Sequence, residues 1–175
     1  MPKYQMEPDK TIEVTFTDDL LAGDFEGFEN ELKGIKANLT GTIGDHTFQD
    51  FIELQTATFS NVTKVGKAAF DNCRGLSNIA LPNVKEIEEY TFSNCKALLQ
   101  MELPNLEKMD VTSFRGCENL EIIYLNSIDM ITISENIRIF EGCGRLKSIR
   151  LGAGKDEIAH TIAGLLGRDI EILVN

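Results

Sequence analysis

The sequence has no tryptophan, only three tyrosines and only two histidines among its 175 residues. Carbohydrate sites usually offer aromatic platforms, so this scarcity makes a carbohydrate-binding module a weak alternative. His46 and His160 lie in opposite halves of the chain, whereas a nucleophile and its base must lie within hydrogen-bonding reach. The carboxylates stand at scattered positions, and no glycosidase-type pair can be identified among them. We therefore expect two surface histidines and no enzyme activity.

Long hydrophobic runs and an excess of positive charge are also missing. The apolar runs extend over a few residues only, so no membrane-spanning segment is expected. Seventeen Lys and Arg stand against 28 Asp and Glu, which gives a net charge of −11 and disfavours nucleic acid as a partner. The first residues lack the charged start, apolar run and cleavage site of a secretory signal. The sequence thus leaves open an intracellular protein or a chain without its leader.

What the sequence does contain is an internal repeat. The phrase Phe-x-x-Cys-x-x-Leu-x-x-Ile/Met-x-Leu begins four times, at spacings of 22, 22 and 26 residues. Its successive slots are filled by Phe70, Phe92, Phe114 and Phe140, by Cys73, Cys95, Cys117 and Cys143, by Leu76, Leu98, Leu120 and Leu146, by Ile79, Met101, Ile123 and Ile149, and by Leu81, Leu103, Leu125 and Leu151. The longer last spacing places an insertion within residues 126–139.

The repeat continues upstream in weaker form. One repeat length before the first full copy, the same slots hold Phe48, Phe51, Leu54, Ala57 and Phe59. One step earlier Leu32 and Ile35 still fit, whereas Glu26 and Glu29 do not. A second apolar slot lies five residues before Phe48, Phe70, Phe92 and Phe114, and it is filled by Ile43, Val65, Ile87 and Met109. Turn-forming residues recur at Asn61, Asn83 and Asn105 and at Asp50, Asn72, Asn94, Gly116 and Gly142.

One repeat unit has too few apolar residues to form a core alone. Stacking the units aligns each slot with its copy in the next coil, so that the buried residues form parallel ladders. We expect the Leu-x-x-Ile-x-Leu stretch to be a short strand that pairs in parallel with its neighbours, about 4.8 Å apart. Six such coils would span on the order of 30 Å.

These residues resemble the BspA-type, or Treponema pallidum-type, leucine-rich repeat. Its pattern is Leu-x-x-Ile-x-Leu-Pro-x-x-Val-x-x-Ile, four variable residues, then Phe-x-x-Cys, and residues 76–95 and 98–117 fit it closely. The resemblance covers roughly residues 43–151, with departures at Phe51, Asn126 and Gly152 and in the expanded coil after Leu125. It implies a right-handed curved solenoid and a surface-exposed or secreted protein of bacteria or some protozoa. It also implies adhesion to host matrix proteins or to other cells, and no catalytic residues.

Both ends of the chain resemble α/β caps that cover an open solenoid core. Residues 11–17 alternate as a half-buried strand, and a helix is expected from Asp18 or Asp19 to Leu32, with Leu20, Leu21, Phe25 and Phe28 on its apolar face. Residues 156–166 form the pattern of an amphipathic helix, and 169–174 that of a last strand. The expected organisation is a single domain, 1–175, with caps at 1–34 and 152–175 around repeats at 35–151.

The cysteines and the glycine-rich turn suggest no cofactor. A ladder spreads its cysteines along a line, whereas zinc needs four ligands converging on one point. Side chains that point the same way are also poorly placed for disulfides, so we predict four buried free thiols. Residues 151–155, Leu-Gly-Ala-Gly-Lys, lack the spacing of a phosphate loop and are expected to turn into the C-terminal helix.

The outward-facing strip of the strands is the most informative surface. Because side chains alternate on a strand, the residues before each buried Ile and Leu point outward. The strip comprises Thr56, Thr58, Asn78, Ala80, Gln100, Glu102, Ile122, Tyr124, Ser148 and Arg150. An aromatic beside a β-branched residue is typical of an interface anchor, although the inserted loop folding over Ile122 and Tyr124 is an open alternative.

We therefore predict a monomeric protein-interaction module that binds a protein, possibly a matrix or cell-surface protein, through the strand face. The residues expected at the partner are Asn78, Gln100, Glu102, Ile122, Tyr124 and Arg150. The main alternative is a structural spacer with an inert surface. By the family resemblance the location is the cell surface or the secreted fraction, with a cytoplasmic location still open.

Overall fold

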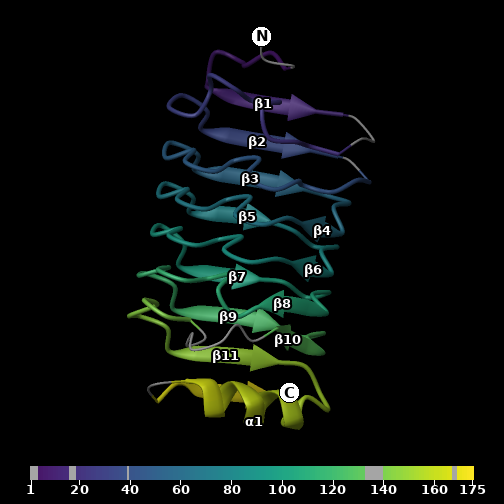
Figure 1. Ribbon diagram of the computed structural model, residues 1–175, viewed down its shortest axis with the longest axis vertical. Coiled ribbons are helices and arrows are strands. Elements are labelled where there is room, and N and C mark those ends of the chain that lie inside the picture. Colours follow the sequence, from purple (N-terminus) through teal and green to yellow (C-terminus); the bar gives the residue numbers. More distant parts are fainter. Residues whose placement is uncertain (1–3, 16–18, 39, 133–139, 167–168) are drawn as a thin grey trace.

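The computed structural model describes residues 4–15, 19–38, 40–132, 140–166 and 169–175. In these residues the chain winds into a β-solenoid of about seven turns, with coils of about 22 residues. The coils stack in sequence order from the N-terminus to the C-terminus, as Figure 1 shows. The solenoid expected from the repeat is thus confirmed.

Two parallel sheets make up the front face of the solenoid. The first, the upper front sheet, has the strand order β1 (Thr11–Val14), β2 (Gly34–Ala37), β3 (Thr56–Phe59), β5 (Asn78–Ala80). The second, the lower front sheet, has the order β7 (Gln100–Glu102), β9 (Ile122–Leu125), β11 (Ser148–Leu151), β12 (Glu171–Val174). The predicted register holds, because Ile79 pairs with Ala57 and Met101 pairs with Ile123.

A third parallel sheet, the side sheet, runs along the solenoid beside the front face (Figure 1). Its strands are β4 (Lys64–Val65), β6 (Glu86–Ile87), β8 (Lys108–Asp110) and β10 (Met130–Thr132). The second apolar slot of the repeat lies on this sheet, where Val65, Ile87 and Met109 are buried. Met130 still pairs with Lys108, one regular repeat length earlier, so the inserted residues fall after Thr132, largely outside the described residues.

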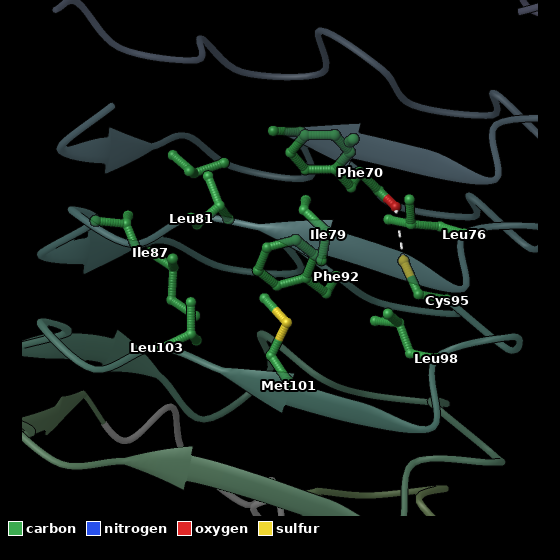
Figure 2. Close-up of a cluster of buried hydrophobic side chains, with 14 of the residues drawn as sticks. Phe70, Leu76, Ile79, Leu81, Ile87, Phe92, Cys95, Leu98, Met101 and Leu103 are labelled. Carbon is green, nitrogen blue, oxygen red and sulfur yellow. Dashed lines mark hydrogen bonds between the residues drawn. The ribbon is translucent and has the colours of Figure 1, made fainter. Parts of the chain in front are cut away.

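The core consists of the predicted ladders. The Phe, Cys, Leu, Ile/Met and Leu slots are all buried, and together they belong to one contiguous cluster that extends from Ile12 to Ile162. Figure 2 shows slot residues of successive coils above one another, with Ile79 over Met101 and Leu81 over Leu103. Each coil therefore completes its core only through its neighbours, which is the reason a single coil is not stable alone.

The phenylalanines form a continuous aromatic stack. The centroids of the Phe70 and Phe92 rings are 5.5 Å apart, with their planes 13° from parallel, and those of Phe92 and Phe114 are 5.4 Å apart. The stack continues in both directions to Phe140 and, through Phe48 and Phe25, to Tyr4. These distances lie in the range that favours offset aromatic packing.

The turns use the residues that the sequence marks. Asp50, Asn72, Asn94, Gly116 and Gly142 all adopt positive φ, between 57° and 77°, a conformation that Gly, Asn and Asp tolerate best. On the opposite side, the Asn105 side-chain amide donates to the carbonyl of Pro82 at 2.7 Å, and that of Asn61 donates to Asn38 Oδ1 at 2.7 Å. Turn side chains thus link consecutive coils.

The prediction of a helix that ends at Leu32 is wrong, because the described residues 19–32 contain no helix. Residues 21–31 form successive turns, and Leu20 makes a β-bridge to Ile43. Phe25 stacks on Phe48 at 4.8 Å, so this stretch is a further coil of the solenoid. Both pairs are offset by one residue more than the regular repeat, which shifts Phe25 out of register and places Glu26 in the expected slot.

The C-terminal end agrees with expectation. Helix α1 spans Asp156–Leu165, follows the turn at Gly154, and buries Ile162 against the core. Strand β12 then pairs with β11. At the N-terminal end β1 covers Thr11–Val14, while residues 16 and 17 of the expected strand lie outside the described residues.

Candidate protein-binding face

The lower front sheet gathers five of the six predicted partner-binding residues. Across β7, β9 and β11 the register places Glu102 beside Tyr124, and Tyr124 beside Arg150. A second row places Gln100 beside Ile122. The sixth residue, Asn78, lies on β5 in the upper front sheet. Because the strands pair in register, these residues of successive repeats lie side by side on one surface.

The predicted partner-binding residues differ in how far they are exposed to solvent. Asn78, Gln100 and Glu102 are exposed, whereas Ile122 and Tyr124 are half-buried on the same face. Ser148, on the same outward strip, is buried instead of exposed. Ser148 pairs with Ile122 on one side and Glu171 on the other, and these larger neighbours cover the small serine.

Tyr124 and Arg150 form the polar-aromatic part of this face. The guanidinium carbon of Arg150 lies 6.0 Å from the centroid of the Tyr124 ring, at the limit of a cation–π contact. The Arg150 Nε is buried and has no hydrogen-bond partner among the described residues. A buried donor without an acceptor costs free energy.

The expected cover by the inserted loop is only partly visible. Residues 126–132 leave β9 through a turn and continue into β10, which belongs to the side sheet. Residues 126–132 therefore keep the regular course of a coil, and the inserted residues that were expected to cover Ile122 and Tyr124 begin after Thr132. The remainder, 133–139, lies outside the described residues.

A groove separates the two front sheets. Strands β5 and β7 do not pair, although their coils remain joined in the side sheet, where Glu86 pairs with Lys108. The groove has a volume of about 350 Å³, and it is lined by Ser77, Asn78, Ile79, Ala80, Leu81, Pro82, Gln100, Glu102 and Pro104.

The groove reaches the core of the solenoid. Ile79 and Leu81 belong to the buried ladders and still line the groove. Ile79 is 9% exposed, against 1% for Met101 in the same slot one coil later. Beside the groove, Leu99 is 56% exposed, at a position that holds Gln55, Ser77, Glu121 or Lys147 in the other coils. An apolar residue in a slot that is otherwise polar or charged was the signal that sequence reasoning missed.

The cysteines are part of the scaffold. All four are buried free thiols, as predicted. The Sγ atoms of Cys73, Cys95, Cys117 and Cys143 each donate to the carbonyl oxygen of the Phe one coil earlier, at 3.0–3.2 Å. Burial raises the pKa of Cys73 and of Cys95 well above the usual value. These thiols are therefore protonated and unreactive at neutral pH.

The remaining candidates have structural roles. His46 and His160 are both exposed, as predicted, and His46 Nδ1 contacts Gln49 Oε1 at 2.8 Å. Among the described residues no group of three or more His, Cys, Asp or Glu side chains is arranged to hold a metal ion. Lys155 of the glycine-rich turn pairs with Asp129 and precedes α1. None of the helices described is long and apolar enough to cross a membrane.

Comparison with known families agrees with the repeat geometry. The profile of the BspA type leucine rich repeat region matches six copies over residues 35–162. The chain belongs to the BspA-type leucine-rich-repeat family. This family match spans more than half of the sequence and includes the coils that build the lower front sheet.

Solved leucine-rich-repeat structures share the fold. A Treponema pallidum leucine-rich-repeat protein is 24% identical with a TM-score of 0.58, covering 85% of this chain and 67% of that one. A Bacteroides ovatus leucine-rich-repeat protein is 20% identical with a TM-score of 0.67, and the match covers 93% of this chain but only 42% of that protein. A leucine-rich cell-surface protein of Faecalibacterium prausnitzii is 16% identical with a TM-score of 0.52, covering 85% of this chain and 68% of that one. A search of curated protein sequences finds no match.

Proposed function

We propose that this BspA-type protein is a non-catalytic recognition module that binds another protein through its front face. The observation that carries the proposal is the row of Glu102, Tyr124 and Arg150 beside Ile122 on paired strands. Tyr and Arg are enriched among residues that dominate binding energy. Rigid strands also hold these side chains in place before binding, which lowers the entropy lost on association.

The chemistry of the partner follows from this row. An apolar contact is expected on Ile122 and on the exposed part of the Tyr124 ring, and an acceptor such as a carboxylate is expected near Arg150. The partner is thus a folded protein or peptide with an apolar patch and an acidic group that faces Arg150. The six residues predicted from the sequence remain the proposed binding set: Asn78, Gln100, Glu102, Ile122, Tyr124 and Arg150.

The setting that we propose is adhesion at a bacterial cell surface or in the secreted fraction. The family membership supports it, as does the description of the Faecalibacterium prausnitzii structure as a cell-surface protein. Protease treatment of intact source cells, followed by detection of the chain with an antibody, tests the location. Loss of the chain under conditions that spare a cytoplasmic marker supports it, and full protection contradicts it.

The experiment that tests the function is a binding screen against matrix and cell-surface proteins with a matched pair of variants. The test variant carries Ile122→Asp and Tyr124→Asp, and the control variant carries Lys85→Asp and Lys108→Asp on and beside the side sheet. Loss of binding in the test variant alone supports the front face. Equal binding by all three proteins contradicts the choice of face, and absence of any partner favours the spacer function.

The division into one domain with terminal caps is also a proposal. It treats residues 1–175 as a monomeric unit with caps at 1–34 and 152–175. Urea unfolding followed by circular dichroism and by tyrosine fluorescence should give coincident transitions, and light scattering should give the monomer mass. Two separated transitions would contradict the single domain, and a dimer at high concentration would contradict the monomer.

A further inference from the structure

Backbone N–H and C=O groups of β5 and β7 point into the groove. In other coils the residue that opens the front strand donates its N–H to a carbonyl of the preceding coil, as Thr56 does to Lys33 at 3.2 Å and Asn78 does to Gln55 at 3.2 Å. Gln100 occupies the same slot, so its N–H is directed towards β5. No backbone hydrogen bond joins residues 77–82 to residues 99–104, a stretch that is described throughout.

The other side of the groove presents complementary groups. In a parallel strand, successive residues direct their N–H and C=O to opposite neighbours. Because Asn78 bonds to the preceding coil, the N–H and C=O of Ile79 point towards β7. The groove therefore has a strand edge on each side, one from β5 and one from β7. Both strands run in the same direction, as the arrows in Figure 1 show.

We propose that this groove receives an extended segment of a partner protein as an additional strand between β5 and β7. The proposal rests on protein recognition by the front face and names the kind of segment that is recognised. An inserted strand would lie about 4.8 Å from each neighbour and bond to both edges. A free strand edge attracts another chain because its N–H and C=O groups lack partners.

The lining selects the side chains of that segment. Glu102 is the only charged residue that lines the groove, in a chain with a net charge of −11, so a Lys or Arg is favoured at an outward position. The inward positions face Ile79 and favour a small aliphatic residue. Leu99 offers an exposed apolar contact next to the groove. Proline is excluded wherever an N–H must be donated.

A second copy of this chain is a poorer occupant. Its terminal front strands are β1, with the exposed Glu13, and β12, with the exposed Glu171. Either would bring a carboxylate towards Glu102, and like charges repel across neighbouring strands. The charges therefore favour a basic segment from a different protein over self-association.

The test uses the intact protein and a fluorescein-labelled peptide, Thr-Val-Lys-Val-Lys-Val-Thr, in a fluorescence anisotropy titration to 1 mM. The control peptide replaces each Val by Pro. The test variant is Glu102→Lys, and the matched control is Glu53→Lys at an exposed position outside the groove. Amide hydrogen exchange by NMR follows the Gln100 N–H with and without peptide.

We expect the valine peptide to bind saturably and to protect the Gln100 amide, and the proline peptide not to bind. The Glu102→Lys variant should bind the valine peptide with roughly fivefold weaker affinity, whereas Glu53→Lys should bind it as the native protein does. No binding of the valine peptide, or binding that leaves the Gln100 amide unprotected, overturns the proposal. If a protein partner still binds and depends on Ile122 and Tyr124, recognition by the front face survives that failure. If the Gln100 amide becomes protected as the protein concentration rises in the absence of peptide, a second copy of the chain occupies the groove. That result would overturn the proposal that a segment of a different protein binds there.

Discussion

The thiol of Cys95 donates a hydrogen bond to the carbonyl oxygen of Phe70, 25 residues earlier, with an Sγ···O distance of 3.2 Å (Figure 2). The same carbonyl accepts the backbone N–H of Cys73 at 3.2 Å. The Phe and Cys slots of the repeat are therefore linked within a coil and between coils. This explains why a small, weakly polar side chain stands at a fully buried position.

Replacing Cys95 by alanine should lower the free energy of unfolding by about 1–2 kcal/mol. The change removes the thiol from a packed site but leaves the Phe70 carbonyl with its backbone donor. Urea denaturation of Cys95→Ala and of the native protein measures the difference. Unchanged stability would show that the thiol contributes nothing to coil stacking.

Native thiols should not react with a disulfide reagent within minutes, and four should react after denaturation. Their burial both blocks access and keeps them protonated. Absorbance after addition of Ellman's reagent measures the number in each state. Fewer than four reactive thiols in the denatured, unreduced protein would contradict the free-thiol assignment.

Stability should fall as the pH rises above about 9. The pKa values of Cys73 and Cys95 are raised by burial, and that of Cys117 by a hydrogen bond with Cys143 and by burial, above the usual 9.0. The unfolded state thus loses these protons at lower pH than the native state, so deprotonation favours unfolding. Urea midpoints between pH 7 and 10.5 check this. Cys95→Ala should show a shallower decline, and an equal decline would assign the effect to other groups.

Truncating the aromatic stack should be the most damaging single change. Phe92→Ala removes a fully buried ring that stacks on Phe70 and Phe114, at an expected cost of about 3–5 kcal/mol. Leu99→Ala, at an exposed site, should change stability by less than about 0.5 kcal/mol. Chemical denaturation of the two variants gives the comparison. Similar costs for both would contradict the core assignment.

The asparagine turns should add smaller, separate contributions. Asn105→Ala removes the amide that donates to the Pro82 carbonyl at 2.7 Å, and about 1 kcal/mol should be lost. The exposed Asn30 serves as a control, because no side-chain hydrogen bond is described for it. Thermal and urea unfolding of both variants tests the difference. A cost at Asn30 equal to that at Asn105 would remove the coil-linking role.

The repeat made most of the fold predictable, because every slot from Phe48 to Leu151 recurs at a spacing that the sequence displays. The first coil was mispredicted because its offset is one residue longer than the regular repeat and its apolar residues, Leu20 to Leu32, also fit a helical period. Stacking of Phe25 on Phe48 decides between these, and such long-range packing overrides local periodicity. For the side sheet, the sequence indicated only a second apolar slot and no strands.

The candidate site was predictable in part. Strand alternation identified Ile122, Tyr124 and Arg150 as neighbours, and the register brings them together. Burial of Ser148 depends on the size of the flanking side chains, and the groove depends on two strands failing to pair. The Leu-x-x-Ile/Met-x-Leu pattern is intact on both sides of that groove, so the only sequence signal beside it is the apolar Leu99 in a slot that is otherwise polar or charged.

Amide hydrogen exchange, with and without the partner identified in the binding screen, shows whether the front face recognises that partner. We expect slower exchange in β5, β7, β9 and β11, with little change in β4, β6, β8 and β10. Protection confined to the side sheet, with the front strands unchanged, would contradict recognition by the front face.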